Sequence, residues 1–215
     1  MGLVPSAVSG YSCRMKRSLG SRTLAVPAPV WLIATYDAKG KPNFMTVAWG
    51  GICSSQPPCV TVSLRSATYS HSAIVARKAY TVNIVSSSQA AQADYAGMVS
   101  GRDRNKFADC QFTAGRSSIV DAPFIHEVAL VLECRLMQTL DVGIHTMFVG
   151  EIMDVKADET VLFDDRTLDI ARVSPIIYDT ARRAYRGIGQ EIGPGWEIGK
   201  AVRKQAEESS AEKTE

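Results

Sequence analysis

Apolar and β-branched residues alternate with polar ones along much of the chain, a pattern typical of β-strands. Glycine, proline, aspartate or serine bounds most of the alternating segments, as expected where strands end in turns. The segments with this pattern are 29–36, 42–51, 57–64, 79–85, 126–141 and 145–158. Because short polar or glycine-containing stretches separate several neighbouring segments, we expect the strands to be joined mainly as hairpins.

Helical patterns are fewer and shorter. Thr68 and Ser70 are suitable N-caps for a short helix within 65–78. Serines precede an alanine-rich stretch in 86–101, which ends in a glycine and predicts a second helix.

Two further segments complete the pattern. Residues 181–187 are helix-like, and 101–112 reads as a polar loop. Strands still outnumber helices, so the sequence favours a mainly β fold, a small antiparallel barrel, over a doubly wound parallel sheet.

Composition narrows the possible partners and the cell compartment. The chain has 215 residues, enough for one domain with a substantial core, and its net charge of +2 gives no support for nucleic-acid or anionic-membrane binding. No apolar run is long enough to cross a bilayer. The five cysteines contain no C-x-x-C spacing, so we expect buried free thiols in a reducing cytoplasm, with Cys53 the one to check.

The two ends differ from the rest of the chain. Residues 1–14 have no long apolar stretch and are interpreted as a leader or disordered extension. We expect one domain over 15–203 and a polar C-terminal tail over 204–215, where a helix end frays.

Several familiar motifs are missing. The glycines of 187–193 have the spacing G-x-G-x-x-x-G and follow no strand, which excludes a dinucleotide fingerprint. The sequence holds no P-loop, no histidine pair at metal-ligand spacing and no G-x-S-x-G serine.

The segment 42–51 raises a question that a core strand does not. Asn43 and Thr46 interrupt its apolar residues, and Trp49 stands before two glycines. A strand end with small residues leaves backbone N–H and C=O groups accessible, which favours a bound ligand. For Trp49 the alternative is a plain core anchor.

A second candidate site follows the strand at 57–64. Arg65 provides a cation, Thr68 and Ser70 provide hydroxyls, and a helix start exposes amides near Tyr69. This combination is suited to a phosphate. The alternative is ordinary N-capping by Ser70.

The run 16–65, which contains Asn43, Thr46, Trp49 and Arg65, resembles the flavin reductase-like, flavoredoxin-type family of FMN-binding split barrels. The segments RDRNKF (102–107), HTMFVGEI (145–152) and YRGIGQEIGPGWEIGK (185–200) match the same family in order. The resemblance implies an antiparallel split β-barrel with Greek-key connections and FMN as cofactor.

The resemblance also implies which residues bind FMN. The strand around Thr46 would lie along the flavin ring, and the helix start near Tyr69 would hold the phosphate. The expected cofactor-binding residues are Asn43, Met45, Thr46, Val47, Ala48, Trp49, Arg65, Thr68, Tyr69, Ser70, Lys106 and His145.

Lys106 and His145 are the residues expected to act in catalysis. In the family a lysine at the position of Lys106 approaches the ring, where a cation stabilises the reduced, negatively charged flavin. The alternative is a solvated loop lysine. Relatives often carry Gly-Asp-His where this chain has Gly143, Ile144 and His145, so His145 lacks an adjacent acid. Its alternative is a histidine that bonds to backbone at the strand start.

The expected activity is the transfer of electrons from NAD(P)H through FMN to a flavin, protein or small-molecule acceptor. One alternative is a flavoredoxin-type carrier that holds FMN tightly and has no NAD(P)H activity; another is a barrel for a different ligand or a protein partner. We expect a homodimer with no nucleic-acid or membrane partner. The aromatic residues Tyr178, Tyr185 and Trp196 would cover the flavin or pack at the dimer interface.

Overall fold

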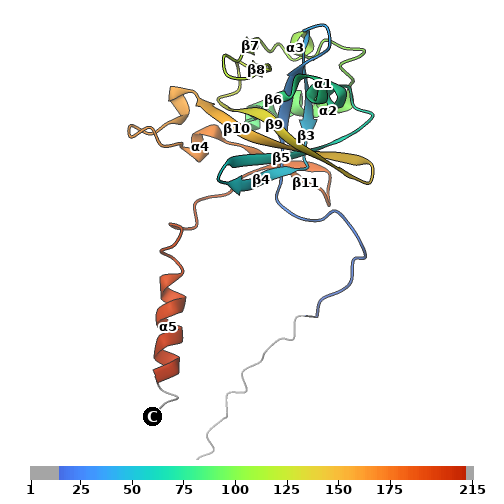
Figure 1. Ribbon diagram of the computed structural model, residues 1–215. Helices are drawn as coiled ribbons and strands as arrows, with labels where there is room; N and C mark the ends of the chain where they lie inside the picture. The colour runs from blue at the N-terminus through green and yellow to red at the C-terminus, as the bar shows by residue number, and fades with distance from the viewer. Residues whose placement is uncertain (1–14, 212–215) are drawn as a thin grey trace, which may run out of the picture.

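The structure is a computed structural model that describes residues 15–211. Figure 1 shows a compact β-rich body from which helix α5 (Lys200–Ala211) projects. The extension expected at 1–14 and the last four residues of the tail lie outside the described residues. The domain limits at 15 and 203 stay a prediction.

Most strands form one seven-stranded sheet in the order β3-β2-β6-β9-β10-β5-β4, with every neighbouring pair antiparallel. Its strands are β2 (Trp31–Tyr36), β3 (Pro42–Val47), β4 (Gly50–Ser55), β5 (Pro58–Arg65), β6 (Ala79–Ile84), β9 (Leu130–Val142) and β10 (His145–Ala157). The predicted mainly β, antiparallel architecture is confirmed.

Two small sheets complete the body. One has the order β1-β11-β12 and the other pairs β7 with β8. Their strands are β1 (Ala28–Pro29), β7 (Ala114–Arg116), β8 (Pro123–Ile125), β11 (Ile176–Asp179) and β12 (Ala184–Gly187). The helix expected over 181–187 is therefore wrong, because this segment pairs with β11, with Tyr185 opposite Tyr178.

The helices are short and lie around the sheet. They are α1 (Tyr69–Arg77), α2 (Ala90–Met98), α3 (Lys106–Asp109) and α4 (Ile170–Val173), with 3-10 turns η1 (Ser87–Gln89) and η2 (Glu159–Val161). The predicted loop over 101–112 contains α3, which begins where the Asn105 side chain accepts a hydrogen bond from the Ala108 amide.

The predicted strand 42–51 is two strands on opposite edges of the large sheet. β3 pairs with β2, whereas β4 pairs with β5. The Ser63 amide donates to the Trp49 carbonyl at 2.8 Å, which holds the connection against β5. Gly50 fits here because an added Cβ would lie 2.5 Å from the Trp31 ring.

Alternating residues of the central strands enter two separate cores. Leu32 packs in the cluster around Phe44 and Phe107, while Ile33 packs in the cluster around Tyr80. The rings of Phe44 and Phe107 meet edge to face at 4.9 Å. Since both faces of β2 and β6 are buried, these strands form the rigid support from which β3 and its neighbouring helices project.

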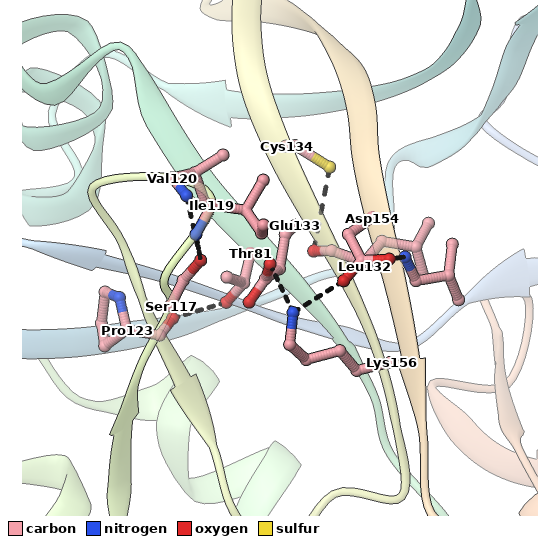
Figure 2. A network of polar contacts seen from close by, with 11 residues as sticks. Thr81, Ser117, Ile119, Val120, Pro123, Leu132, Glu133, Cys134, Asp154 and Lys156 are labelled. Carbon is pink, nitrogen blue, oxygen red and sulfur yellow. Dashed lines mark hydrogen bonds and ion pairs between the residues drawn. The ribbon is translucent and has the colours of Figure 1, made fainter.

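An ionic cluster on one face of β9 joins a buried glutamate to a lysine and an aspartate that are partly exposed. The Glu133 carboxylate is fully buried and accepts a hydrogen bond from Lys156 Nζ at 2.7 Å. Lys156 also donates to Asp154 at 2.8 Å, and Figure 2 shows this lysine bridging the two carboxylates. Burial alone would lower the pKa of Lys156, but its hydrogen bonds to Asp154 and Glu133 outweigh burial and raise it.

Within residues 15–211, no helix has the length and apolar character needed to span a membrane. Cys59, Cys110 and Cys134 are buried free thiols, as the sequence predicts, whereas Cys53 is exposed. Cys13 lies outside the described residues.

Candidate functional site

A cavity of about 270 Å³ lies between edge strand β3, the start of α1 and the end of α2 with the loop that follows it. Strand β3 pairs only with β2, so its other edge offers backbone groups toward this region. The cavity brings together seven of the predicted site residues: Asn43, Met45, Thr46, Thr68, Tyr69, Ser70 and Lys106.

The floor of the cavity is a tightly packed polar pair. Asn43 Nδ2 donates to Ser70 Oγ at 2.9 Å, and both side chains are buried. Gly101 closes against them, since an added Cβ would lie 2.2 Å from Asn43 Oδ1 and 2.7 Å from the Tyr69 ring. Only a glycine fits at this position without displacing two residues that line the cavity.

The start of α1 leaves hydrogen-bond donors available. Thr68 is the N-cap residue, but its hydroxyl donates to the Arg65 carbonyl at 2.8 Å and makes no capping bond. Ser70 lies inside the helix and bonds to Asn43, so the alternative of N-capping by Ser70 is wrong. The amides of Tyr69 and Ser70 have no acceptor among the described atoms and are available for an anion.

Arg102 supplies a cation at this helix start. Its guanidinium lies 5.6 Å from the Tyr69 ring centroid and donates to the Ala67 carbonyl at 3.2 Å. The Tyr69 hydroxyl in turn donates to Asp37 at 2.8 Å, which fixes the ring. The cation predicted from the sequence was Arg65, but Arg65 lies outside this cavity. Arg102 belongs to a loop distant in the sequence.

Lys106 reaches the cavity from inside the protein. The residue is 4% exposed, and its Nζ donates to the Ala96 carbonyl in the last turn of α2 at 2.7 Å. Burial lowers the pKa of its ammonium to about 8, and the Cys110 thiol offsets a small part of this effect. The alternative of a solvated loop lysine is therefore wrong.

The low pKa of Lys106 predicts a pH-dependent change in stability. The folded state holds the ammonium at a pKa near 8, against 10.5 in the unfolded chain. Burying the charged ammonium lowers the unfolding free energy. This cost is present in full below pH 8 and disappears as the pH rises from 8 to 10.5. In Lys106→Met the penalty is absent and the bond to Ala96 is lost, so we expect a gain of about 1 to 2 kcal/mol in unfolding free energy at pH 6.5.

Urea denaturation of ligand-free protein at several pH values measures this effect. The advantage of Lys106→Met should shrink as the pH rises above 8. The exposed Lys39 provides the control, because Lys39→Met removes a surface lysine and should change the unfolding free energy by no more than about 0.5 kcal/mol at pH 6.5. An advantage of Lys106→Met that does not vary with pH would contradict the assignment.

The other predicted site residues lie elsewhere. His145 begins β10 opposite Arg65 of β5, and both lie outside the cavity. Val47 faces the core, and Ala48 lines a neighbouring cavity. Trp49 is 37% exposed and lines a third hollow, so it is no core anchor.

His71, unlike His145, is linked to an acid through the hydroxyl of a threonine. His71 Nε2 lies 2.9 Å from Thr146 Oγ1, which donates to Asp141 at 2.6 Å. Because the Thr146 hydroxyl proton goes to Asp141, Thr146 must accept from His71, and this places a proton on Nε2. The arrangement links α1 to the β9–β10 ribbon and had no signal in the spacing of these residues.

A second cavity of about 400 Å³ adjoins the first. Both cavities are lined by Thr46, Gly97 and Met98, so α2 forms their common wall. Tyr178 and Tyr185 line the second cavity, while Trp196 is 97% exposed and lies outside both.

Helix α2 is tied to three separate parts of the protein. The Thr46 hydroxyl of β3 donates to the Ala93 carbonyl, and Lys106 of α3 donates to the Ala96 carbonyl. The Tyr185 hydroxyl of β12 donates to Asp94 at 2.8 Å. These contacts fix the wall between the two cavities.

Comparisons with known proteins identify the family and the fold. A family model described as flavin reductase like domain matches residues 22–188. A solved structure, the flavoredoxin of Desulfovibrio vulgaris (Miyazaki F), is 44% identical with a TM-score of 0.83, and the match covers 86% of this chain and 100% of that one.

Two curated proteins are similar over shorter stretches. An uncharacterized protein of Archaeoglobus fulgidus is 34% identical over 115 residues, which cover 54% of this chain and 65% of that protein. An FMN reductase (NADH), RutF, of Pseudomonas syringae pv. syringae is 28% identical over 147 residues, covering 65% of this chain and 78% of that protein.

Proposed function

We propose that this chain, which belongs to the family of flavin reductase like domains, binds FMN in the first cavity and uses it to transfer electrons. The membership itself establishes a split-barrel protein of flavin-linked electron transfer. The choice of FMN, the residues that hold it and the source of the electrons are the proposal.

The observation that carries the proposal is the uncapped start of α1 facing a cavity with two cations. FMN ends in a phosphate with about two negative charges at neutral pH. The free amides of Tyr69 and Ser70, together with the Arg102 guanidinium, fit such an anion. Gly101 leaves the space that a side chain would fill.

The remaining site residues fit the ring of a flavin. The free edge of β3 at Met45 and Thr46 offers main-chain donors and acceptors to the polar end of the ring. Lys106 holds a positive charge at neutral pH, which favours a reduced, negatively charged flavin. Met98 and the end of α2 line one side of the cavity.

FMN, when bound, supplies the acceptance and release of hydride and electrons; the protein binds, orients and tunes it. We propose NAD(P)H as donor and a flavin, a protein or a small molecule as acceptor. The name of the Pseudomonas relative, an FMN reductase that uses NADH, supports this direction. His145 and Arg65 remain proposed contributors from the adjoining sheet end, beside the cavity.

A second candidate function is an electron carrier without NAD(P)H activity. It is favoured by the similarity to the Desulfovibrio flavoredoxin, whose whole length matches 86% of this chain at 44% identity. Such a carrier would keep FMN through purification and exchange electrons with protein partners.

An absorption spectrum of protein collected from gel filtration tests both functions. We expect a flavin band with about one FMN per chain, and bleaching of this band when NADH or NADPH is added without oxygen. A retained band that neither nucleotide bleaches would identify the carrier. Colourless protein that takes up no added FMN would reject both functions in favour of another ligand or a protein partner.

We also propose a homodimer in the cytoplasm. The long β9–β10 ribbon carries exposed apolar side chains, which a second copy would cover. They are Met137, Leu140, Val142, Ile144, Met153 and Val155. Light scattering on the same column gives the mass, and a monomer that still holds FMN would contradict the dimer. The free thiols at Cys53, Cys59, Cys110 and Cys134 fit a reducing compartment.

A further inference from the structure

The second cavity has features that the FMN site does not use. It is about 400 Å³, and Tyr178 and Tyr185 form an aromatic wall with ring centroids 5.6 Å apart. Both rings belong to the β11–β12 hairpin, which is a different part of the chain from the phosphate cradle. The two ring planes are tilted by 52° to each other, and an aromatic face in a cavity favours a planar ligand that can stack on it.

The aromatic wall is fixed in position. The Tyr185 hydroxyl donates to Asp94 of α2 at 2.8 Å. Burial and this hydrogen bond raise the pKa of Tyr185, so the phenol stays neutral and acts as a donor. Tyr185 therefore cannot supply charge to a ligand, and its donor is already engaged.

A single cation lines the cavity from the hairpin turn. Arg183 has φ +53°, in the left-handed region where glycine or asparagine is usual and where other residues cost about 1 to 2 kcal/mol. Asp179 holds the turn by accepting from the amides of Ala181 and Arg182. A strained backbone at a cavity is a common mark of a functional residue.

The charge of Arg183 is uncompensated within residues 15–211. Asp179, in the same turn, pairs with Arg186 at 2.9 Å. The other acid that lines the cavity, Asp94, accepts a hydrogen bond from Tyr185. No carboxylate among the described residues forms an ion pair with Arg183, and the side chain is exposed at the cavity. An anionic group on a ligand would meet this guanidinium directly.

We propose that the second cavity receives the reactant that exchanges electrons with the flavin, a planar heteroaromatic molecule carrying a negative charge, and that Arg183 selects for this charge. The inference rests on the proposed function. The two cavities lie side by side, because Thr46, Gly97 and Met98 line both of them. A nicotinamide nucleotide donor and a free flavin phosphate acceptor share this chemistry. Tyr178 and Tyr185 orient the planar group.

The test compares full-length wild type with three variants. Arg183→Asn removes the charge and suits the left-handed backbone, while Arg183→Lys keeps the charge. Arg182→Asn is the matched control, because Arg182 is the adjacent exposed arginine and lies outside the cavity. FMN content and FMN dissociation constants are measured first for each protein.

Four probes separate charge from ring shape and donor from acceptor. NADH and uncharged 1-benzyl-1,4-dihydronicotinamide serve as donors, and FMN and riboflavin serve as free acceptors. Arg183→Asn should raise the KM for NADH or for free FMN about tenfold, which corresponds to about 1.4 kcal/mol. The KM for the uncharged member of the same pair should change less than twofold. The KM values of Arg183→Lys should stay close to those of the wild type.

Calorimetry with 1,4,5,6-tetrahydro-NADH, which cannot give up a hydride, and with FMN measures binding independently of turnover. The charged probe that weakens identifies the donor or the acceptor as the occupant. Unchanged binding of both probes in Arg183→Asn would overturn the inference, as would an equal loss of the bound cofactor. Protein that neither retains FMN nor takes up added FMN would reject the proposed function, and calorimetry with 1,4,5,6-tetrahydro-NADH on ligand-free protein would still decide the role of Arg183.

Discussion

Gly101→Ala should lose FMN binding by at least about 100-fold, equivalent to about 2.7 kcal/mol, while the protein remains folded. The added Cβ would lie 2.2 Å from Asn43 Oδ1 and 2.7 Å from the Tyr69 ring. Asn43 is held by Ser70, and Tyr69 is held by Asp37, so neither side chain can retreat without breaking a hydrogen bond. Fluorescence titration of ligand-free protein with FMN measures the effect.

Gly51→Ala provides the control for added bulk, since nothing lies within 4 Å of its ideal Cβ. It should bind FMN like the wild type. A thermal melt reports folding of both variants, and overpacking at Gly101 should reduce stability by about 1 to 3 kcal/mol. Wild-type affinity in a folded Gly101→Ala protein would show that FMN binds elsewhere.

Lys156→Met should reduce the free energy of unfolding by about 3 kcal/mol. The Glu133 carboxylate is fully buried, and Lys156 is its cationic partner at 2.7 Å (Figure 2). Glu133 Oε1 already has no hydrogen-bond partner among the described atoms. Without Lys156, a charge would remain in the interior with no compensation. Urea denaturation at pH 7 measures the change.

Two further variants interpret the result. Arg135→Met breaks an ion pair with Glu151 between the same two strands, but Arg135 is mostly exposed, so its effect should stay within about 0.5 kcal/mol. Glu133→Leu combined with Lys156→Met removes both charges and should recover most of the lost stability. An unchanged urea midpoint for Lys156→Met alone would mean that water reaches Glu133 freely.

The strands were predictable wherever their period was unbroken, as in the long segments that became β9 and β10. Strand β4 was missed because its first residues, Gly50 and Gly51, were assigned to the end of the predicted strand 42–51. Residues 181–187 read as helical because alanine and arginine are good helix formers, yet pairing with β11 prevails over this propensity. Helix α3 has four residues, too few to show a period.

The candidate site could also be predicted only in part from the sequence. The segment around Tyr69 was predictable because a helix start and its amides are local features. The cation beside it was misplaced at Arg65, because only the folded chain brings Arg102 to that position. Sequence also sought an acid next to His145, whereas the structure links Asp141 through Thr146 to His71. The contact of Arg102 with Tyr69 and that of Thr146 with His71 join residues far apart in sequence, where spacing carries no information.

We expect the three ties on α2 to couple ligand binding in the two cavities. The helix is one nine-residue segment held by β3, α3 and β12, so a displacement at either cavity strains the same hydrogen bonds. Whatever factor an occupant of the tyrosine-lined cavity imposes on FMN affinity, FMN imposes on that occupant in return. On the proposed function, the shared wall would therefore couple the affinity for the reactant to the affinity for the cofactor.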